Sequence, residues 1–78
     1  MKLPRGVSAD RLVRALEKLG YTVIRQKGSH IRLFHQAAPM HSISVPNHDP
    51  LKIGTSHGIL VEVARAQSVS IEDILDLL

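Results

Sequence analysis

The clearest candidate for a catalytic group in this sequence is a histidine close to a lysine and two arginines. Residues 27–30 are Lys-Gly-Ser-His, and Arg25 and Arg32 lie just outside this stretch. Histidine has an unperturbed pKa of ~6.5, so it can take up and release a proton near neutral pH. Cationic side chains stabilise negative charge that develops on phosphorus oxygens. A site built on His30 could therefore combine general acid–base catalysis with the binding of a phosphate group.

The glycine–serine step predicts the turn that would position these side chains. Residues 21–26 and 31–36 resemble two short β-strands, with polar and apolar residues intermixed. A two-residue loop with glycine first is the pattern of a type II′ turn, in which the first central residue takes a positive φ. This turn makes Lys27 and His30 cross-strand neighbours and places Arg25 opposite Arg32.

Continued along the hairpin, this register pairs Ile24 with Leu33 and Val23 with Phe34. Side chains alternate between faces along a strand, so the hairpin has two distinct faces. The expected core face holds Ile24, Ile31 and Leu33, with Thr22, Gln26 and His35. The expected cationic face holds Arg25, Lys27, His30 and Arg32, with Val23 and Phe34 further from the turn. A bulge at Gly28 would shift this register and scatter the cationic face.

Two arginines directly opposite each other cost stability when no counter-charge is near. An anion between Arg25 and Arg32 would remove this cost, and the alternative is that both side chains turn into water. Phe34 could stack on a nucleic-acid base or be buried under a loop.

The other segments predict a helix before the hairpin, and a third strand with one or two helices after it. Ser8 is a good N-cap, and the leucine spacing predicts a helix over about 9–19 that stops at Gly20. A third strand is expected over 41–45, with its two serines on the side of His30 if Ile43 and Val45 join the core. A second helix is expected from Thr55 or Ser56. A last one begins at Ser70, with Asp73 completing a capping box.

Length and charge limit the classes of function. With 78 residues the chain buries only ~60% of its unfolded surface, so we expect residues 1–78 to form a single small domain. Residues 1–35 contain eight Lys/Arg and two acidic residues, whereas residues 36–78 contain two and five. A basic N-terminal half suits a polyanionic partner such as nucleic acid, but a solvated surface would show a similar balance.

Several other classes of protein are disfavoured because the sequence lacks the features typical of them. There is no cysteine, which suits a reducing cytoplasm, and there is neither a signal peptide nor an apolar run long enough to span a membrane. The five histidines show no HxH, HxxxH or HExxH spacing, so we expect no protein-built metal site and no cofactor.

An ordered set of short motifs resembles the HicA toxins of bacterial and archaeal toxin–antitoxin pairs. A helix is followed by Gly20-Tyr21 and by residues 25–30, Arg-Gln-Lys-Gly-Ser-His. Residues 45–48, Val-Pro-Asn-His, and 52–55, Lys-Ile-Gly-Thr, come later in the same order. The resemblance spans nearly the whole chain. It departs from the family pattern at residues 56–58, Ser-His-Gly, where an apolar and a basic residue often follow Gly-Thr.

The resemblance implies an α+β fold like that of a double-stranded-RNA-binding domain. This fold has the order α-β-β-β-α, here with a short extra C-terminal helix, and its helices lie on one face of a three-stranded antiparallel sheet. The resemblance also implies metal-independent cleavage of mRNA, a role in stress response, and a HicB-type antitoxin that blocks the site. His30 corresponds to the catalytic histidine of the motif, and Gly28 and Ser29 to the residues that position it.

Acid–base chemistry on RNA can also be argued from the residues themselves. RNA carries its own nucleophile, the 2′-OH, so the main need is proton transfer by a well-placed group. We assign His30 as general base or acid, and Arg25, Lys27 and Arg32 as phosphate contacts. His48 could supply a second acid–base group or cap the chain locally. A non-catalytic RNA-binding module, or an interaction protein that uses its apolar C-terminal helix, would be the alternatives.

Overall fold

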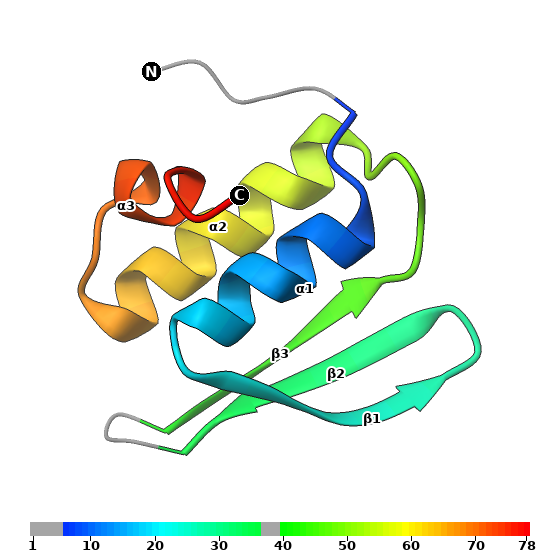
Figure 1. Ribbon diagram of the computed structural model, residues 1–78, viewed down its shortest axis with the longest axis horizontal. Helices are drawn as coiled ribbons and strands as arrows, with labels where there is room; N and C mark the ends of the chain where they lie inside the picture. The colour runs from blue at the N-terminus through cyan, green and yellow to red at the C-terminus, as the bar shows by residue number, and fades with distance from the viewer. Residues whose placement is uncertain (1–5, 37–39) are drawn as a thin grey trace.

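The computed structural model describes residues 6–36 and 40–78, which form three strands and three helices (Figure 1). Along the chain these are α1 (Ala9–Lys18), β1 (Tyr21–Lys27), β2 (His30–His35), β3 (His41–Pro46), α2 (Ile53–Gln67) and α3 (Ile71–Leu75). The strands form one antiparallel sheet in the order β1-β2-β3. The double-stranded-RNA-binding-domain-like fold with an additional C-terminal helix is therefore confirmed.

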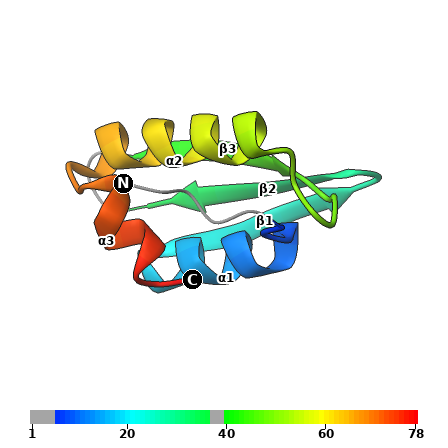
Figure 2. The ribbon, with the colours of Figure 1, turned by 90° about the horizontal axis from the view of Figure 1, so that it is seen from above.

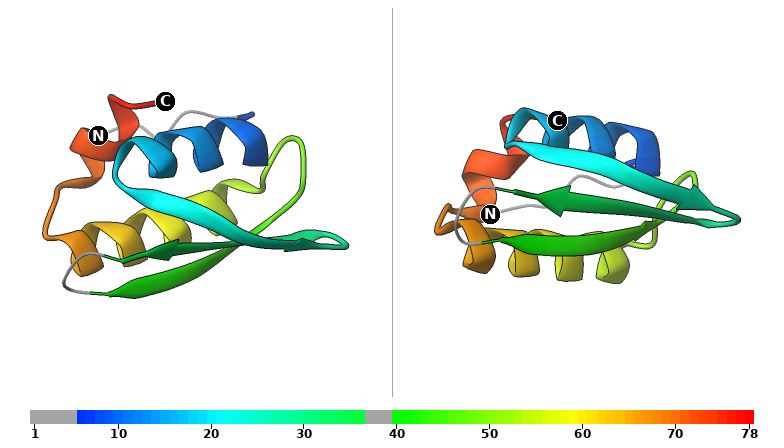
Figure 3. Two further views of the ribbon diagram at one scale, coloured as in Figure 1. Left: turned by 60° about the horizontal axis from the view of Figure 1, so that its bottom comes forward. Right: turned by 90° about the horizontal axis from the view of Figure 1, so that it is seen from below.

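The two long helices lie on the same face of the sheet. α1 packs mainly against β1 and α2 against β3, while α3 contacts both helices (Figure 2). The view from below in Figure 3 shows that none of the described helices covers the opposite face. We call this the open face. The most deeply buried large side chains come from all the helices and from β2 and β3: Leu12, Leu16, Leu33, Val45, Val63 and Ile74.

Local capping fixes two of the helices where the sequence predicts them. The Ser8 hydroxyl accepts a hydrogen bond of 3.1 Å from the backbone N–H of Arg11 and begins α1. The capping box between Ser70 and Asp73 is complete, with hydrogen bonds of 3.0 and 3.3 Å, and begins α3.

The start of α2 differs from the sequence prediction. α2 begins at Ile53, with Lys52 in the N-cap position and no side-chain capping bond. The prediction was wrong because it relied on a capping hydroxyl at Thr55 or Ser56. Ser56 is buried inside the first turn, and its hydroxyl donates to the carbonyl of Ile53 at 3.1 Å.

The hairpin follows the predicted register only near its turn. Lys27 pairs with His30, Gln26 with Ile31 and Arg25 with Arg32, as predicted. Gly28 has a φ of +58°, which agrees with the positive φ expected at the first turn position.

A register shift between Val23 and Arg25 changes the other half of the hairpin. Val23 pairs with Leu33 and Thr22 with Phe34, so Ile24 is the extra residue of a bulge. Ile24 is 56% exposed, and its predicted place in the core was wrong. Val23 takes that place, packing against the core, and Thr22 moves to the open face. Because the bulge lies beyond Arg25, it leaves the cationic side chains nearer the turn in register.

Candidate active site

The predicted cationic face lies on the open face of the sheet. Arg25 pairs with Arg32 and Lys27 with His30, so these four side chains share one side of the hairpin. All four are exposed. Their neighbours Ile31 and Leu33 are buried on the helix side, which confirms the predicted alternation in this part of β2. We call these four residues the cationic patch.

Arg32 is held against β3. Its two terminal nitrogens donate to the hydroxyls of Ser44 and Ser42, at 3.3 and 3.2 Å. Ser42 and Ser44 lie on this side because Ile43 and Val45 are buried in the core, as the sequence predicts. A guanidinium has five N–H donors, so Arg32 keeps donors available for a ligand while its position is fixed.

No salt bridge joins the patch to an acidic residue in the described part of the chain. None of the three described strands contains an aspartate or glutamate. The salt bridges of the described residues join Arg14 to Asp10 and His41 to Glu62, and neither involves the patch. Arg25, Lys27 and Arg32 are therefore left with uncompensated charge at the surface, which favours a polyanionic ligand.

His30 lies where the hairpin turn meets the end of β3. It pairs with Lys27 on one side and with Pro46 on the other. The hydroxyl of Ser29 lies 3.4 Å from its Nδ1, a long contact that orients the ring only weakly. The ring is exposed, so a substrate can reach it directly.

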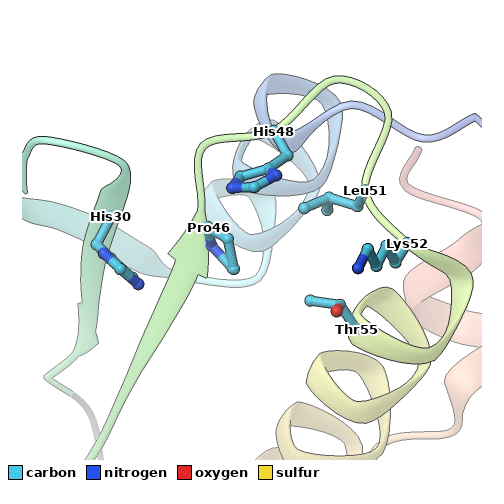
Figure 4. A pocket seen from close by; sticks show the side chains of 6 residues that line it. All are labelled: His30, Pro46, His48, Leu51, Lys52 and Thr55. Atoms are coloured by element: carbon cyan, nitrogen blue, oxygen red, sulfur yellow. The ribbon is translucent and has the colours of Figure 1, made fainter.

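A pocket of about 290 Å³ opens beside His30 (Figure 4). It lies where the chain passes from the end of β3 to α2. In Figure 4 the side chain of Pro46 lies between that of His30 and that of His48, which comes from the loop after β3. The pocket is lined by His30, Pro46, His48, Leu51, Lys52 and Thr55. It thus brings together the two histidines that sequence analysis named as acid–base candidates.

The structure also adds residues that sequence analysis did not place in the site. Lys52 and Thr55 line the pocket, although the sequence pointed to them only as part of a motif and a helix start. Ser42 and Ser44 were expected on this face, but their contact with Arg32 was not. Phe34 lies on the open face and is half-buried, opposite Ser42.

The remaining strand histidines lie on the other side of the sheet. The Nε2 of His35 is 3.1 Å from the carbonyl of Leu19. His41 contacts Tyr21 and Glu62, at 2.7 and 2.9 Å. Both therefore take part in packing between the sheet and the helices, away from the open face.

Neither a metal cluster nor a membrane span is found in the described residues. No group of three or more His, Cys, Asp or Glu side chains among them is arranged to hold a metal ion. None of the described helices has the length and apolarity needed to cross a membrane.

A sequence model of the HicA toxins of bacterial toxin–antitoxin systems matches residues 9–64. This range covers well over half of the chain and includes the cationic patch and every residue of the pocket. The chain belongs to the HicA toxin family. Comparisons with curated proteins and with solved structures give no significant match.

Membership of the HicA family makes the chain a toxin of a toxin–antitoxin pair, with an antitoxin as its partner. The matched range ends within α2, so α3 lies outside it. The family match therefore covers the part of the fold that contains the cationic patch and the pocket.

Proposed function

We propose that this HicA toxin is a metal-independent endoribonuclease that cleaves mRNA and is inhibited by a HicB-type antitoxin. His30 acts as a general acid or base, and Arg25, Lys27 and Arg32 bind phosphates of the RNA backbone. Gly28 and Ser29 hold the turn that presents His30. The proposal places this activity in the cytoplasm, where mRNA and the antitoxin are both present.

The observation that carries this proposal is the position of His30 within the cationic patch on the open face of the sheet. The exposed ring, the three cations beside it and the pocket at its edge support a site that acts on a phosphodiester. An imidazole side chain can serve as a general acid or a general base. The cations attract the RNA backbone and stabilise the charge that grows on the phosphorus oxygens.

The reaction needs no external nucleophile because RNA supplies the 2′-OH. A positioned acid or base accelerates such proton transfers by ~10²–10⁴-fold. We therefore expect purified His30→Ala protein, freed from antitoxin, to lose RNA cleavage by at least that factor. Growth arrest on expression should be lost as well. Because His30 is exposed, the substitution should leave the unfolding temperature unchanged.

Cleavage should be measured on mRNA with and without a metal chelator, and His57→Ala is the matched control. His57 is also exposed, but it lies on α2 and does not line the pocket. A folded His30→Ala protein that still cuts RNA would show that the assignment is wrong. Tight RNA binding by the wild-type protein with no cleavage would instead favour the alternative of a non-catalytic RNA-binding module.

A further inference from the structure

We infer that His48 is the second acid–base group of the reaction and that the scissile phosphate lies in the pocket between His48 and His30. This inference rests on the proposed ribonuclease activity and goes one step further. It assigns a catalytic role to a side chain on the loop between β3 and α2 and makes the pocket the reaction centre.

The first argument is that the backbone around His48 is fixed relative to His30. The N–H of Asn47 donates to the carbonyl of Ser29 in the hairpin turn, at 2.6 Å. This bond ties the loop that carries His48 directly to the turn that carries His30.

The loop is fastened to α1 as well. The N–H of Ala9 donates to the carbonyl of His48 at 3.0 Å, and the N–H of Leu51 donates to the carbonyl of Val7 at 2.8 Å. Leu51 is buried, which anchors the end of the loop in the core. The backbone of His48 is therefore used for packing while its side chain is exposed and faces the pocket.

The second argument is that the pocket suits an anion. Lys52 contributes a positive charge, and Thr55 lines the pocket from the first turn of α2. No side chain caps this turn, so its N–H groups add positive potential at the same end. The lining contains no carboxylate. A phosphate held here would lie between two imidazole rings, with a cation beside it.

The third argument is chemical, because cleavage of an RNA phosphodiester requires two proton transfers. One histidine takes the proton of the 2′-OH as its oxygen forms a bond to phosphorus. The other donates a proton to the 5′ oxygen as the bond between phosphorus and that oxygen breaks. The products are a 2′,3′-cyclic phosphate and a 5′-hydroxyl, and the two histidines have exchanged protonation states. A single histidine cannot hold both positions at once, whereas two on opposite sides of a pocket can.

The test compares His48→Ala with His57→Ala on an RNA that the wild-type protein cleaves. We expect His48→Ala to reduce kcat by ~10²–10⁴-fold, with little change in the affinity for an uncleavable 2′-deoxy analogue. His57→Ala should match the wild type. His48→Gln, which keeps the size and polarity of the side chain, serves as the second variant and should lose activity similarly.

The pH dependence separates a catalytic His48 from one that only supports the loop. The wild-type rate should be bell-shaped, with one limb for the base and one for the acid, and His48→Ala should lose one limb. Added imidazole should restore part of the rate of His48→Ala. A substrate with a 5′-thio leaving group, which needs no acid, should restore the rate of whichever variant lacks the acid.

The inference fails if the wild-type protein cleaves RNA, His30→Ala does not, and His48→Ala retains the full rate and both limbs. It also fails if His48→Ala is slow but keeps both limbs and does not respond to imidazole, since that pattern indicates a structural role. By contrast, absence of cleavage by the wild-type protein would overturn the proposed function itself.

Discussion

At the scale of single residues, Arg32 is a cation whose position is fixed by neighbouring side chains of the sheet. Its guanidinium is held by Ser42 and Ser44, so the proposed binding of a phosphate would cost less side-chain freedom. We expect Arg32→Ala, made in a His30→Ala background that does not cleave, to weaken RNA binding. The slope of log affinity against log salt should fall by about 0.7 for a single-stranded RNA.

Arg65→Ala is the charge-matched control for this measurement. Arg65 is exposed in the last turn of α2, in the helix layer, and should leave both the affinity and the slope unchanged. Equal effects of the two substitutions would mean that RNA responds to net charge and not to the cationic patch.

At the scale of elements, the hairpin turn depends on the backbone freedom of Gly28. Its φ of +58° is unfavourable for a side-chain-bearing residue, although a Cβ there would meet no atom within 4 Å. Gly28→Ala should therefore destabilise the protein by about 1–2 kcal/mol through the backbone alone. For a domain of this size the unfolding temperature falls by ~4–8 °C for each kcal/mol. RNA cleavage should fall as well, since the turn sets the place of His30.

Gly58→Ala is the contrasting substitution, because Gly58 lies within α2, also with no atom near a new Cβ. It should raise the unfolding temperature, as alanine is favoured in a helix by about 1 kcal/mol. Both variants are compared by thermal unfolding. If Gly28→Ala were as stable as Gly58→Ala, the positive φ would not be what holds the turn.

The same elements show what local sequence can and cannot predict. The turn and its nearest pairs were predictable because a two-residue loop fixes the register beside it. The bulge at Ile24 was not, because it depends on which of Val23 and Ile24 fits under the helices. The pocket was also hidden, since its shape depends on distant hydrogen bonds that place the loop of His48 against Ser29 and Ala9. The sequence therefore predicts the cationic patch, but it does not predict that His30 of this patch shares a pocket with Lys52 and Thr55.

At the scale of the whole molecule, the two ends of the sheet differ: one carries the candidate site, and the other is hydrogen-bonded to α2. The cationic patch and the pocket lie at the hairpin end. At the other end a chain of hydrogen bonds joins the sheet to α2: Gln67 donates to the Tyr21 hydroxyl at 3.2 Å, and His41 lies between Tyr21 and Glu62. A carboxylate can only accept, so Nε2 of His41 donates to Glu62. This network holds the strand ends against α2 without using any residue of the site.

The network can be followed through Tyr21, which is the only tyrosine in a chain without tryptophan. Burial raises the pKa of the Tyr21 hydroxyl above its ordinary value of 10.0, and the nearby charge of Glu62 raises it further, while the hydrogen bond from Gln67 lowers it. Because this pKa is higher in the folded than in the unfolded state, the stability that the neutral Tyr21 hydroxyl contributes to the fold is complete below pH ~10. It is lost as the pH rises through the folded pKa, because the unfolded chain ionises first.

The ionisation of Tyr21 can be followed by near-ultraviolet absorbance. The tyrosinate midpoint should lie above 10 in the folded protein, over the pH range where circular dichroism shows native structure. In urea it should lie near 10. Glu62→Gln should move the folded midpoint down and Gln67→Ala should move it up, whereas a folded midpoint at 10 or below would contradict the burial of this hydroxyl.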